Sequence, residues 1–165
     1  MTATASTPVQ PAYKIIPMSH DFDSLLAAMA TIAGKNTPEE VKKLAVAKQL
    51  LPEHGPYWSG DDMLIAKIFV QLGFVSTVWK EASSFSELPS LALVLDDYDE
   101  DTDLGRFVVY HRRLVSPPST RQEEAMLLDC AYWLTPEQRV RRDFNNFQTP
   151  IWFIGVSQMG KVVAK

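Results

Sequence analysis

The sequence predicts an α+β domain in which N-terminal helices pack against a mostly antiparallel β-sheet. Between residues 19 and 72, apolar side chains recur every three or four positions, which is the period of a buried or amphipathic helix. From residue 74 onward the pattern changes to short runs of β-branched and aromatic residues bounded by turn residues, which is typical of strands. Helical patterns therefore come first along the chain, and strand patterns follow.

Three helices are expected before the first strand, over residues 19–34, 37–52 and 59–73. Gly34 suits the C-terminal cap of the first helix, because glycine adopts left-handed backbone angles without strain. Thr37, Pro38 and Glu40 predict a capping box at the start of the second helix. A serine or aspartate at position 59 or 61 is expected to cap the third.

Short strands are expected in the second half of the chain. They cover residues 74–79, 91–95, 107–115, 125–130 and 151–156. A short helix is expected between the last two strands, because Thr135-Pro136-Glu137-Gln138 has the form of another capping box.

Length and composition fit one globular domain. The chain has 165 residues, of which 46% are hydrophobic and 22% are charged, so it is long enough for one sizeable core. Residues 1–12 are rich in Thr, Ala, Ser and Pro and show no hydrophobic period, which predicts a flexible tail. The domain is therefore expected to span residues 13–165.

Charge and cysteine content exclude several classes of function. A formal net charge of -4 gives no general attraction to phosphate backbones, so no nucleic-acid partner is expected. No apolar run approaches the ~20 residues that a membrane helix needs, so no membrane insertion is expected. Cys130 is the only cysteine, which excludes an intrachain disulfide and favours a reducing, cytoplasmic setting. Without a phosphate-binding glycine loop, no cofactor is expected.

The strongest local charge feature is the acidic run at residues 96–103, Asp-Asp-Tyr-Asp-Glu-Asp-Thr-Asp. Alternating carboxylates suit a hard cation, but the run lacks the mid-loop glycine and the distal glutamate of an EF-hand. A solvated hairpin loop is therefore expected, with a basic partner or a bound cation as the alternative. His20, His54 and His111 are far apart in the chain, so no metal site is expected.

Cys130 and His111 are the candidate pair for an active enzyme, because an imidazole within hydrogen-bond reach activates a thiol nucleophile. Cys130 lies in a predicted strand, however, where a buried and inert thiol is expected instead. The four tryptophans are expected mainly in the core, with the lining of a pocket as the alternative.

Several segments occur in an order that is known from one enzyme family. They are residues 21–30, residues 88–95 after a Leu-Pro pair, Arg106-Phe107-Val108-Val109, and Leu127-Leu128-Asp129-Cys130. Over residues 13–156 this order resembles papain-like cysteine peptidases of the bacteriocin-processing type. That family includes inactive domains at the front of some toxin-exporting ABC transporters. The resemblance implies a papain-like fold.

The resemblance also implies that the peptidase chemistry is lost. In the family, a cysteine at the start of the first helix is the nucleophile, a strand histidine is the base, and a carboxylate orients the imidazole. The matching positions here are Phe22, Arg106 and Asp129, and no glutamine for an oxyanion hole stands between residues 13 and 21. The expected function is therefore non-catalytic binding of a peptide or protein partner in the old cleft. The residues expected at that cleft are Asp21, Asp23, Trp58 and Arg106.

Two other functions stay open. An active cysteine hydrolase or transferase would use Cys130 and His111, and a small adaptor or immunity-type protein would act through its acidic loop. The resemblance further implies that Arg106 and Asp129 project from adjacent strands to one place, where the guanidinium can take the partner of the imidazole through a charge-assisted hydrogen bond, including a bidentate one. The alternative is that Arg106 neutralises the loop at residues 99–103.

Overall fold

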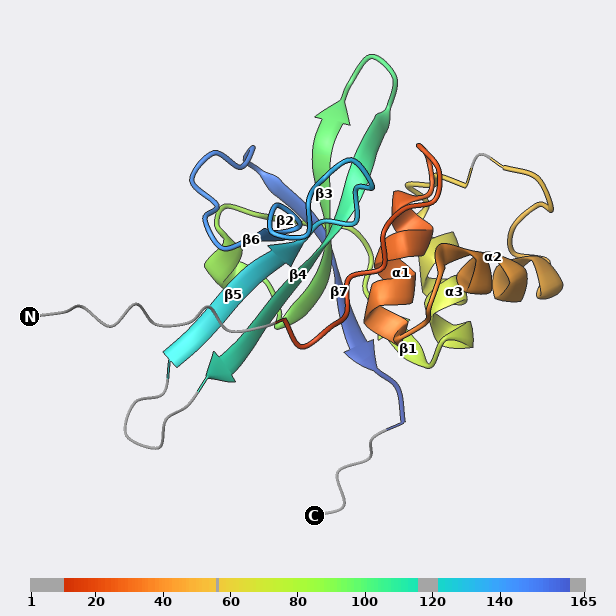
Figure 1. Cartoon of the computed structure of the whole chain (residues 1–165), viewed down its shortest axis with the longest axis horizontal. Helices are drawn as coiled ribbons and strands as arrows, with labels where there is room; N and C mark the ends of the chain where they lie inside the picture. The colour runs from red at the N-terminus through yellow and green to blue at the C-terminus, as the bar shows by residue number, and fades with distance from the viewer. Residues whose placement is uncertain (1–10, 56, 116–121, 161–165) are drawn as a thin grey trace, which may run out of the picture.

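The computed structural model describes residues 11–55, 57–115 and 122–160, and this part of the chain has an α+β fold (Figure 1). The helices are α1 (Ser24–Ala33), α2 (Pro38–Ala47), α3 (Asp62–Gln71) and the 3-10 helix η1 (Phe85–Glu87). The strands are β1 (Phe74–Ser76), β2 (Lys80–Ala82), β3 (Leu91–Asp99), β4 (Leu104–Val115), β5 (Gln122–Leu128), β6 (Val140–Arg141) and β7 (Ile151–Gln158). The predicted fold class is confirmed, whereas residues 1–10 of the predicted tail lie outside the described residues.

The strands form one sheet in the order β1-β7-β3-β4-β5-β6, and β2 also pairs with β7. Within the described ranges every pairing is antiparallel, as the sequence predicts. In β4, Val109 pairs with Leu93 of β3 on one side and with Leu128 of β5 on the other. The three α-helices gather on one side of the sheet (Figure 1).

Apolar side chains are buried on both faces of the sheet. On the face that the helices cover, Phe107 of β4 packs in one cluster with Leu25 of α1 and Ile65 of α3. On the opposite face, Phe85 of η1 belongs to a second cluster, and its ring centroid lies 4.4 Å from that of Phe144. The α-helices therefore cover one face, and η1 and the segment between β6 and β7 cover the other.

Local sequence explains where the helices begin and end. Gly34 caps α1 with a left-handed φ of 71°, as predicted. Asp61 caps α3, because its Oδ1 accepts two backbone N–H groups of the first turn at 3.0 and 3.4 Å. The capping box expected at Thr37 does not form. Thr37 makes no side-chain cap bond, and Glu40 accepts the backbone N–H of Asn36 instead.

The structure corrects the predicted bounds of the strands, and two corrections bear on the site and its neighbours. The expected strand at 74–79 is shorter, because β1 ends at Ser76 and the next strand, β2, begins only at Lys80. Between them, Thr77 donates its backbone N–H to the Gly155 carbonyl of β7 and its hydroxyl accepts the Gly155 N–H, each at 2.9 Å. The expected strand at 125–130 is β5, which begins earlier and ends at Leu128. Asp129 and Cys130 therefore lie just beyond a strand end.

The helix expected at Thr135 is a single turn. The predicted reciprocal bonds do form, since Thr135 N–H donates to the Gln138 side chain at 3.0 Å and Gln138 N–H donates to the Thr135 hydroxyl at 3.4 Å. The chain then enters β6, which pairs with β5. Strand pairing therefore ends the turn before a helix can grow.

The first turn of α1 rests on the sheet at β4. The hydroxyl of Ser24, the first residue of α1, accepts the backbone N–H of Phe107 at 3.2 Å. This contact places the start of α1 beside Arg106, the preceding residue of β4. In the described ranges, no helix has the length and apolar character needed to cross a membrane.

Candidate functional site

Arg106 and Asp129 meet where β4 runs beside the end of β5. The guanidinium donates two hydrogen bonds, from Nε to Oδ1 at 3.1 Å and from Nη2 to Oδ2 at 2.8 Å. Asp129 is 1% exposed, so this charge-assisted pair is shielded from water on the carboxylate side. The predicted bidentate pair is confirmed.

Two more carboxylates and a second guanidinium complete this cluster. Arg106 Nη2 lies 3.4 Å from Asp96 Oδ2, and Arg106 Nη1 donates to Asp97. Arg141 of β6 donates to the same Asp96 oxygen at 2.5 Å. Arg106 therefore reaches the first two residues of the acidic run as well as Asp129, and not the loop at residues 99–103 that the alternative named.

These carboxylates keep Arg106 charged. Burial disfavours the charged guanidinium, but the hydrogen bond from Arg106 to Asp129 and the charges of the nearby carboxylates raise the pKa of Arg106 above its ordinary value. A side chain that stays protonated has no lone pair to accept a proton. Arg106 therefore cannot act as a general base at neutral pH.

The start of α1 and Arg106 line a cavity of about 200 Å³, which we call the α1 cavity. Phe22 and Trp133 also line it, and they are 49% and 55% exposed. The Arg106 guanidinium lies 5.5 Å from the centre of the Trp133 ring, within reach of a cation–π contact. Ser24 is buried, and its hydroxyl accepts the N–H of Phe107. The nucleophile position of the resemblance is thus an exposed aromatic side chain beside an ion cluster.

The other residues expected at the cleft have different surroundings. Asp21 lines the α1 cavity and accepts a hydrogen bond from the Tyr132 hydroxyl at 2.5 Å. Asp23 is buried just before α1, where its Oδ2 accepts the N–H of Ser19 at 3.0 Å. Its Oδ1 has no partner among the described residues, and burial raises the pKa of Asp23. Trp58 lines a separate cavity and not this one.

Cys130 and His111 are not brought together. Cys130 is 1% exposed, burial raises its pKa to about 12, and its Sγ lies 3.4 Å from the Thr31 hydroxyl. His111 pairs across the sheet with Met126, whereas Cys130 lies four residues further along the chain, beyond the end of β5. The buried thiol expected from the sequence is confirmed. Among the described hydrogen bonds, none joins this thiol to the imidazole.

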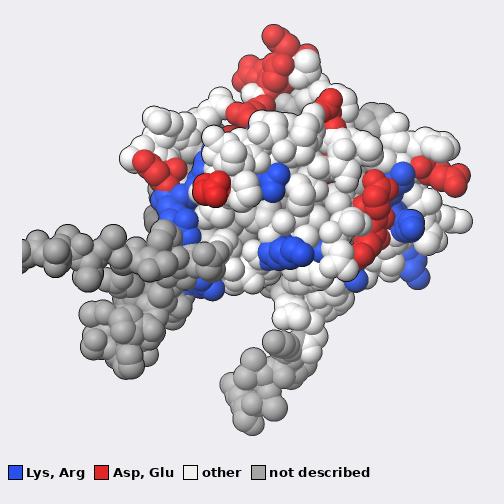
Figure 2. All heavy atoms as spheres, viewed as in Figure 1, with Lys and Arg blue, Asp and Glu red and all other residues white. Residues whose placement is uncertain are grey.

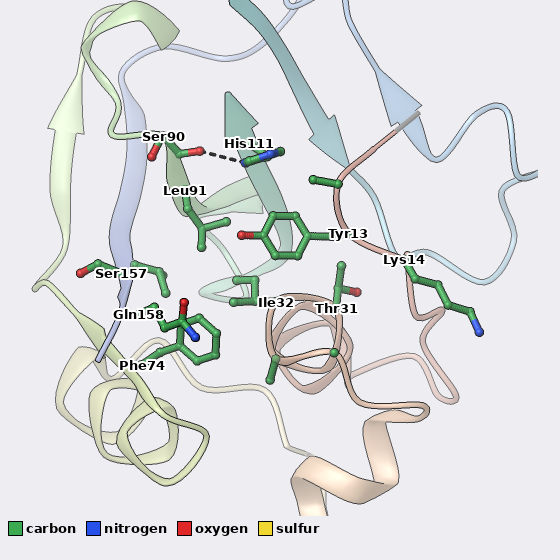
Figure 3. Close-up of a pocket in the computed structure, with 14 residues that line it drawn as sticks. Tyr13, Lys14, Thr31, Ile32, Phe74, Ser90, Leu91, His111, Ser157 and Gln158 are labelled. Atoms are coloured by element: carbon green, nitrogen blue, oxygen red, sulfur yellow. Dashed lines mark hydrogen bonds between the residues drawn. The ribbon is translucent and has the colours of Figure 1, made fainter. Parts of the chain in front are cut away.

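His111 instead faces a cavity of about 600 Å³ that Tyr13, Thr31 and Gln158 also line (Figure 3). Its Nδ1 lies 3.2 Å from the Ser90 carbonyl oxygen, and the Tyr13 ring packs edge-on against it with centroids 4.9 Å apart. Burial lowers the pKa of His111, which favours the neutral imidazole. It serves there as a packed, hydrogen-bonded side chain.

The acidic run forms the tip of the hairpin that joins β3 to β4. Figure 1 shows this hairpin projecting beyond the rest of the sheet, and Figure 2 shows acidic side chains gathered at the same place. The side chains at positions 99–101 and 103 are exposed, so the predicted solvated hairpin loop is confirmed for the tip. Throughout the described ranges, no group of three or more His, Cys, Asp and Glu residues is arranged to hold a metal ion.

A further cavity of about 540 Å³, the aromatic cavity, lies beside this hairpin. Its polar and aromatic lining comprises Trp58, Trp79, Trp152, Tyr98, Asp61 and Asp103. Trp152 is 41% exposed. The expectation of mainly core tryptophans is therefore wrong for Trp133 and Trp152, because both side chains are largely exposed, whereas Trp58 and Trp79 pack against the core as well as lining this cavity.

Sequence reasoning missed Arg141 and the part that Asp96 plays in the ion cluster. Arg141 lies in a two-residue strand, which is too short to show a hydrophobic period. The only hint in the sequence is charge, because the basic run at residues 139–142 and the acidic run at residues 96–103 have opposite signs. The spacing of the two runs along the chain does not predict that they come into contact.

A comparison with protein-family models gave no match, and a comparison with curated proteins gave no significant match. Function is therefore inferred from the geometry of the α1 cavity and of the aromatic cavity.

Proposed function

We propose that this domain binds a peptide or protein partner at the α1 cavity and does not hydrolyse peptide bonds. The observation that carries the proposal is the bidentate pair of Arg106 and Asp129. Where the papain-like resemblance puts an imidazole and its orienting carboxylate, the chain holds a permanently charged guanidinium. Such a group cannot activate a nucleophile, and Phe22 at the nucleophile position has no nucleophilic atom.

The exposed aromatic rings of the α1 cavity support binding. Phe22 and Trp133 present apolar surface at the cavity rim, and aromatic side chains are enriched at protein interfaces because they bury much area for few rotatable bonds. The guanidinium of Arg106 over the Trp133 ring helps to hold that ring in place. A reducing setting such as the cytoplasm is part of the proposal, since Cys130 is a free, buried thiol.

Selection of a phage-displayed library of random peptides on the immobilised protein tests the binding function. We expect enriched peptides whose affinity falls at least about tenfold in the double variant Phe22→Ser, Trp133→Ser. Met63→Ser is the matched control, because Met63 is an exposed apolar side chain on α3 that does not line the α1 cavity. Thermal unfolding checks that each variant is folded. No enrichment, or equal affinity for the double variant, contradicts the proposal.

A separate peptidase assay tests the proposal that the domain does not hydrolyse peptide bonds. Wild-type protein incubated with a fluorescently labelled casein at pH 7 is expected to release no fragments above the level of buffer. Cleavage that disappears in both Cys130→Ala and His111→Ala would establish the rival cysteine hydrolase and overturn the non-catalytic function.

A further inference from the structure

The aromatic cavity has the composition of a site for an organic cation. Trp58, Trp79, Trp152 and Tyr98 contribute four aromatic rings to its wall. The face of an aromatic ring carries partial negative charge, and tryptophan attracts cations most strongly. The volume of about 540 Å³ falls within the range of about 300–1,000 Å³ that is common for ligand pockets.

The inner rings of this cavity are held rigidly. Trp79 donates its indole N–H to the Gly60 carbonyl at 2.8 Å, and its backbone N–H donates to Asp62 at 3.1 Å. Trp58 and Trp79 both pack on the buried ring of Phe107, with centroids 5.7 and 5.9 Å away. A ligand would therefore meet rings that are already in position, which reduces the entropy lost on binding.

Two carboxylates complete the lining, and each has one oxygen engaged within the protein. Asp61 uses Oδ1 to cap α3, and Asp103 uses Oδ1 to accept the Tyr98 hydroxyl. None of the hydrogen bonds within the described chain uses Oδ2 of either residue. These oxygens can accept charge-assisted hydrogen bonds from a ligand cation that stacks on the rings.

The surrounding charge favours the same kind of ligand. The exposed acidic residues at the tip of the hairpin stand next to the cavity and give that end of the molecule a negative field (Figure 2). A planar guanidinium both stacks on tryptophan and donates pairs of hydrogen bonds to carboxylates. We propose that the aromatic cavity binds a cationic side chain, with arginine as its best representative, presented by the peptide partner. This inference rests on the proposed peptide-binding function and names the partner's chemistry.

The test compares a charged ligand with its neutral isostere. N-acetyl-arginine methylamide and the corresponding citrulline compound are titrated into the whole protein, and tryptophan fluorescence reports binding. We expect the arginine compound to bind at least about tenfold more tightly than the citrulline compound. Added salt is expected to weaken binding of the arginine compound only. Equal binding of the two compounds overturns the inference.

Two variants and a matched control locate the site. Trp152→Ala and Asp103→Asn are each expected to weaken binding of the arginine compound by at least about fivefold. Asn tolerates the left-handed backbone of Asp103, where φ is 55°. Asp101→Asn removes the same charge from the same hairpin tip without lining the cavity, and it is expected to change affinity less than about twofold. Equal losses for Asp101→Asn and Asp103→Asn would show general charge attraction and overturn the site.

The outcomes also separate this inference from the proposed function. If library peptides bind through Phe22 and Trp133 but citrulline replaces arginine without loss, the cationic site is wrong and peptide binding stands. If the arginine compound binds and Trp152→Ala abolishes its binding while the library gives no enrichment, the cationic site stands and peptide binding at the α1 cavity is wrong.

Discussion

Two buried carboxylates lie near the start of α1, and their surroundings differ. Asp129 accepts both hydrogen bonds of the Arg106 fork and, at 3.1 Å, the backbone N–H of Ala131. Asp23 accepts one backbone N–H through Oδ2, and its Oδ1 is buried without a partner among the described residues. Burial is the leading cause of the raised pKa of Asp23. A buried carboxylate is stabilised where guanidinium groups surround it, and it is destabilised where one of its oxygens is buried without a partner.

This difference shows which groups near the α1 cavity stabilise the fold and which remain able to bind a ligand. The carboxylate that matches the resemblance, Asp129, is fully used in binding Arg106, so it anchors the junction of β4 and β5 instead of orienting a base. Ligand-binding capacity lies instead in groups whose internal contacts leave part of their surface open. These are the exposed rings of Phe22 and Trp133 and the lining of the aromatic cavity. Internal pairing thus decides which polar groups remain for a partner.

Arg106→Ala is expected to have the largest effect on stability. The substitution leaves Asp129 buried without its bidentate partner, and Arg141, 3.5 Å from Asp129, replaces only part of the lost contact. We expect a loss of about 3–5 kcal/mol in the free energy of unfolding, measured by urea denaturation at pH 7. Arg106→Lys is expected to recover only part of the loss, because lysine keeps the charge but cannot form the fork.

The control for Arg106→Ala is an ion pair nearer the surface. Glu124→Gln removes the negative charge from the ion pair of Arg142 and Glu124, whose N and O atoms lie 2.8 Å apart. A loss of only about 0–1 kcal/mol is expected there. If Arg106→Ala loses no more stability than Glu124→Gln, then the cluster around Asp129 is not a structural anchor.

Cys130→Ala is expected to have an intermediate effect. Cys130 packs in a small buried cluster with Met18 and Ala27, and its thiol contacts the Thr31 hydroxyl. Removing the sulfur deletes a small buried group, so we expect a loss of about 1 kcal/mol in the free energy of unfolding. Because burial raises the pKa of the thiol to about 12, little of it is ionised at pH 8.

Alkylation measures the reactivity of the Cys130 thiol directly in the wild-type protein. Iodoacetamide at pH 8 is expected to label Cys130 only after unfolding in urea, as mass spectrometry would show. Complete labelling of the native protein within minutes would show an accessible, activated thiol. That result would support the alternative in which a base activates Cys130 as a nucleophile.

The fold class was predictable because it depends on hydrophobic period, which is a local property. The helical period up to residue 72 and the strand pattern after residue 74 both match the observed elements. Gly34 and Asp61 cap the helices as predicted, since a cap acts within one turn of chain. The helix expected at Thr135 failed because strand pairing of β6 with β5 is a long-range contact that no local signal reveals.

The site was predictable only where strand register fixed it. Arg106 and Asp129 came together because β4 and β5 are adjacent and antiparallel, which the strand order of the resemblance had implied. The contribution of Arg141 and the grouping of Trp58, Trp79 and Trp152 were not predictable. Their side chains come from distant segments, and spacing along the chain does not predict contacts between such segments.

Asp23→Asn is expected to change the free energy of unfolding least, and to raise it rather than lower it. Because burial raises the pKa of Asp23, the charged carboxylate destabilises the folded state at neutral pH. Asparagine keeps an oxygen to accept the Ser19 N–H and remains a good residue before a helix. The variant is therefore expected to be more stable than the wild type at pH 7, as measured by urea denaturation.

The pH dependence distinguishes relief of this charge from a packing effect. Wild-type Asp23 gains its proton as the pH falls through its raised folded-state pKa, so the wild type recovers stability there and the advantage of Asp23→Asn shrinks. Asp21→Asn is the control, because Asp21 is exposed two residues earlier and its loss of charge is expected to change stability by less than about 0.5 kcal/mol. His20 and Glu39 lie close enough to influence Asp23, so the comparison is made between variants at each pH. A pH-independent difference between wild type and Asp23→Asn would mean that the carboxylate is not strained, and the contrast with Asp129 would then disappear.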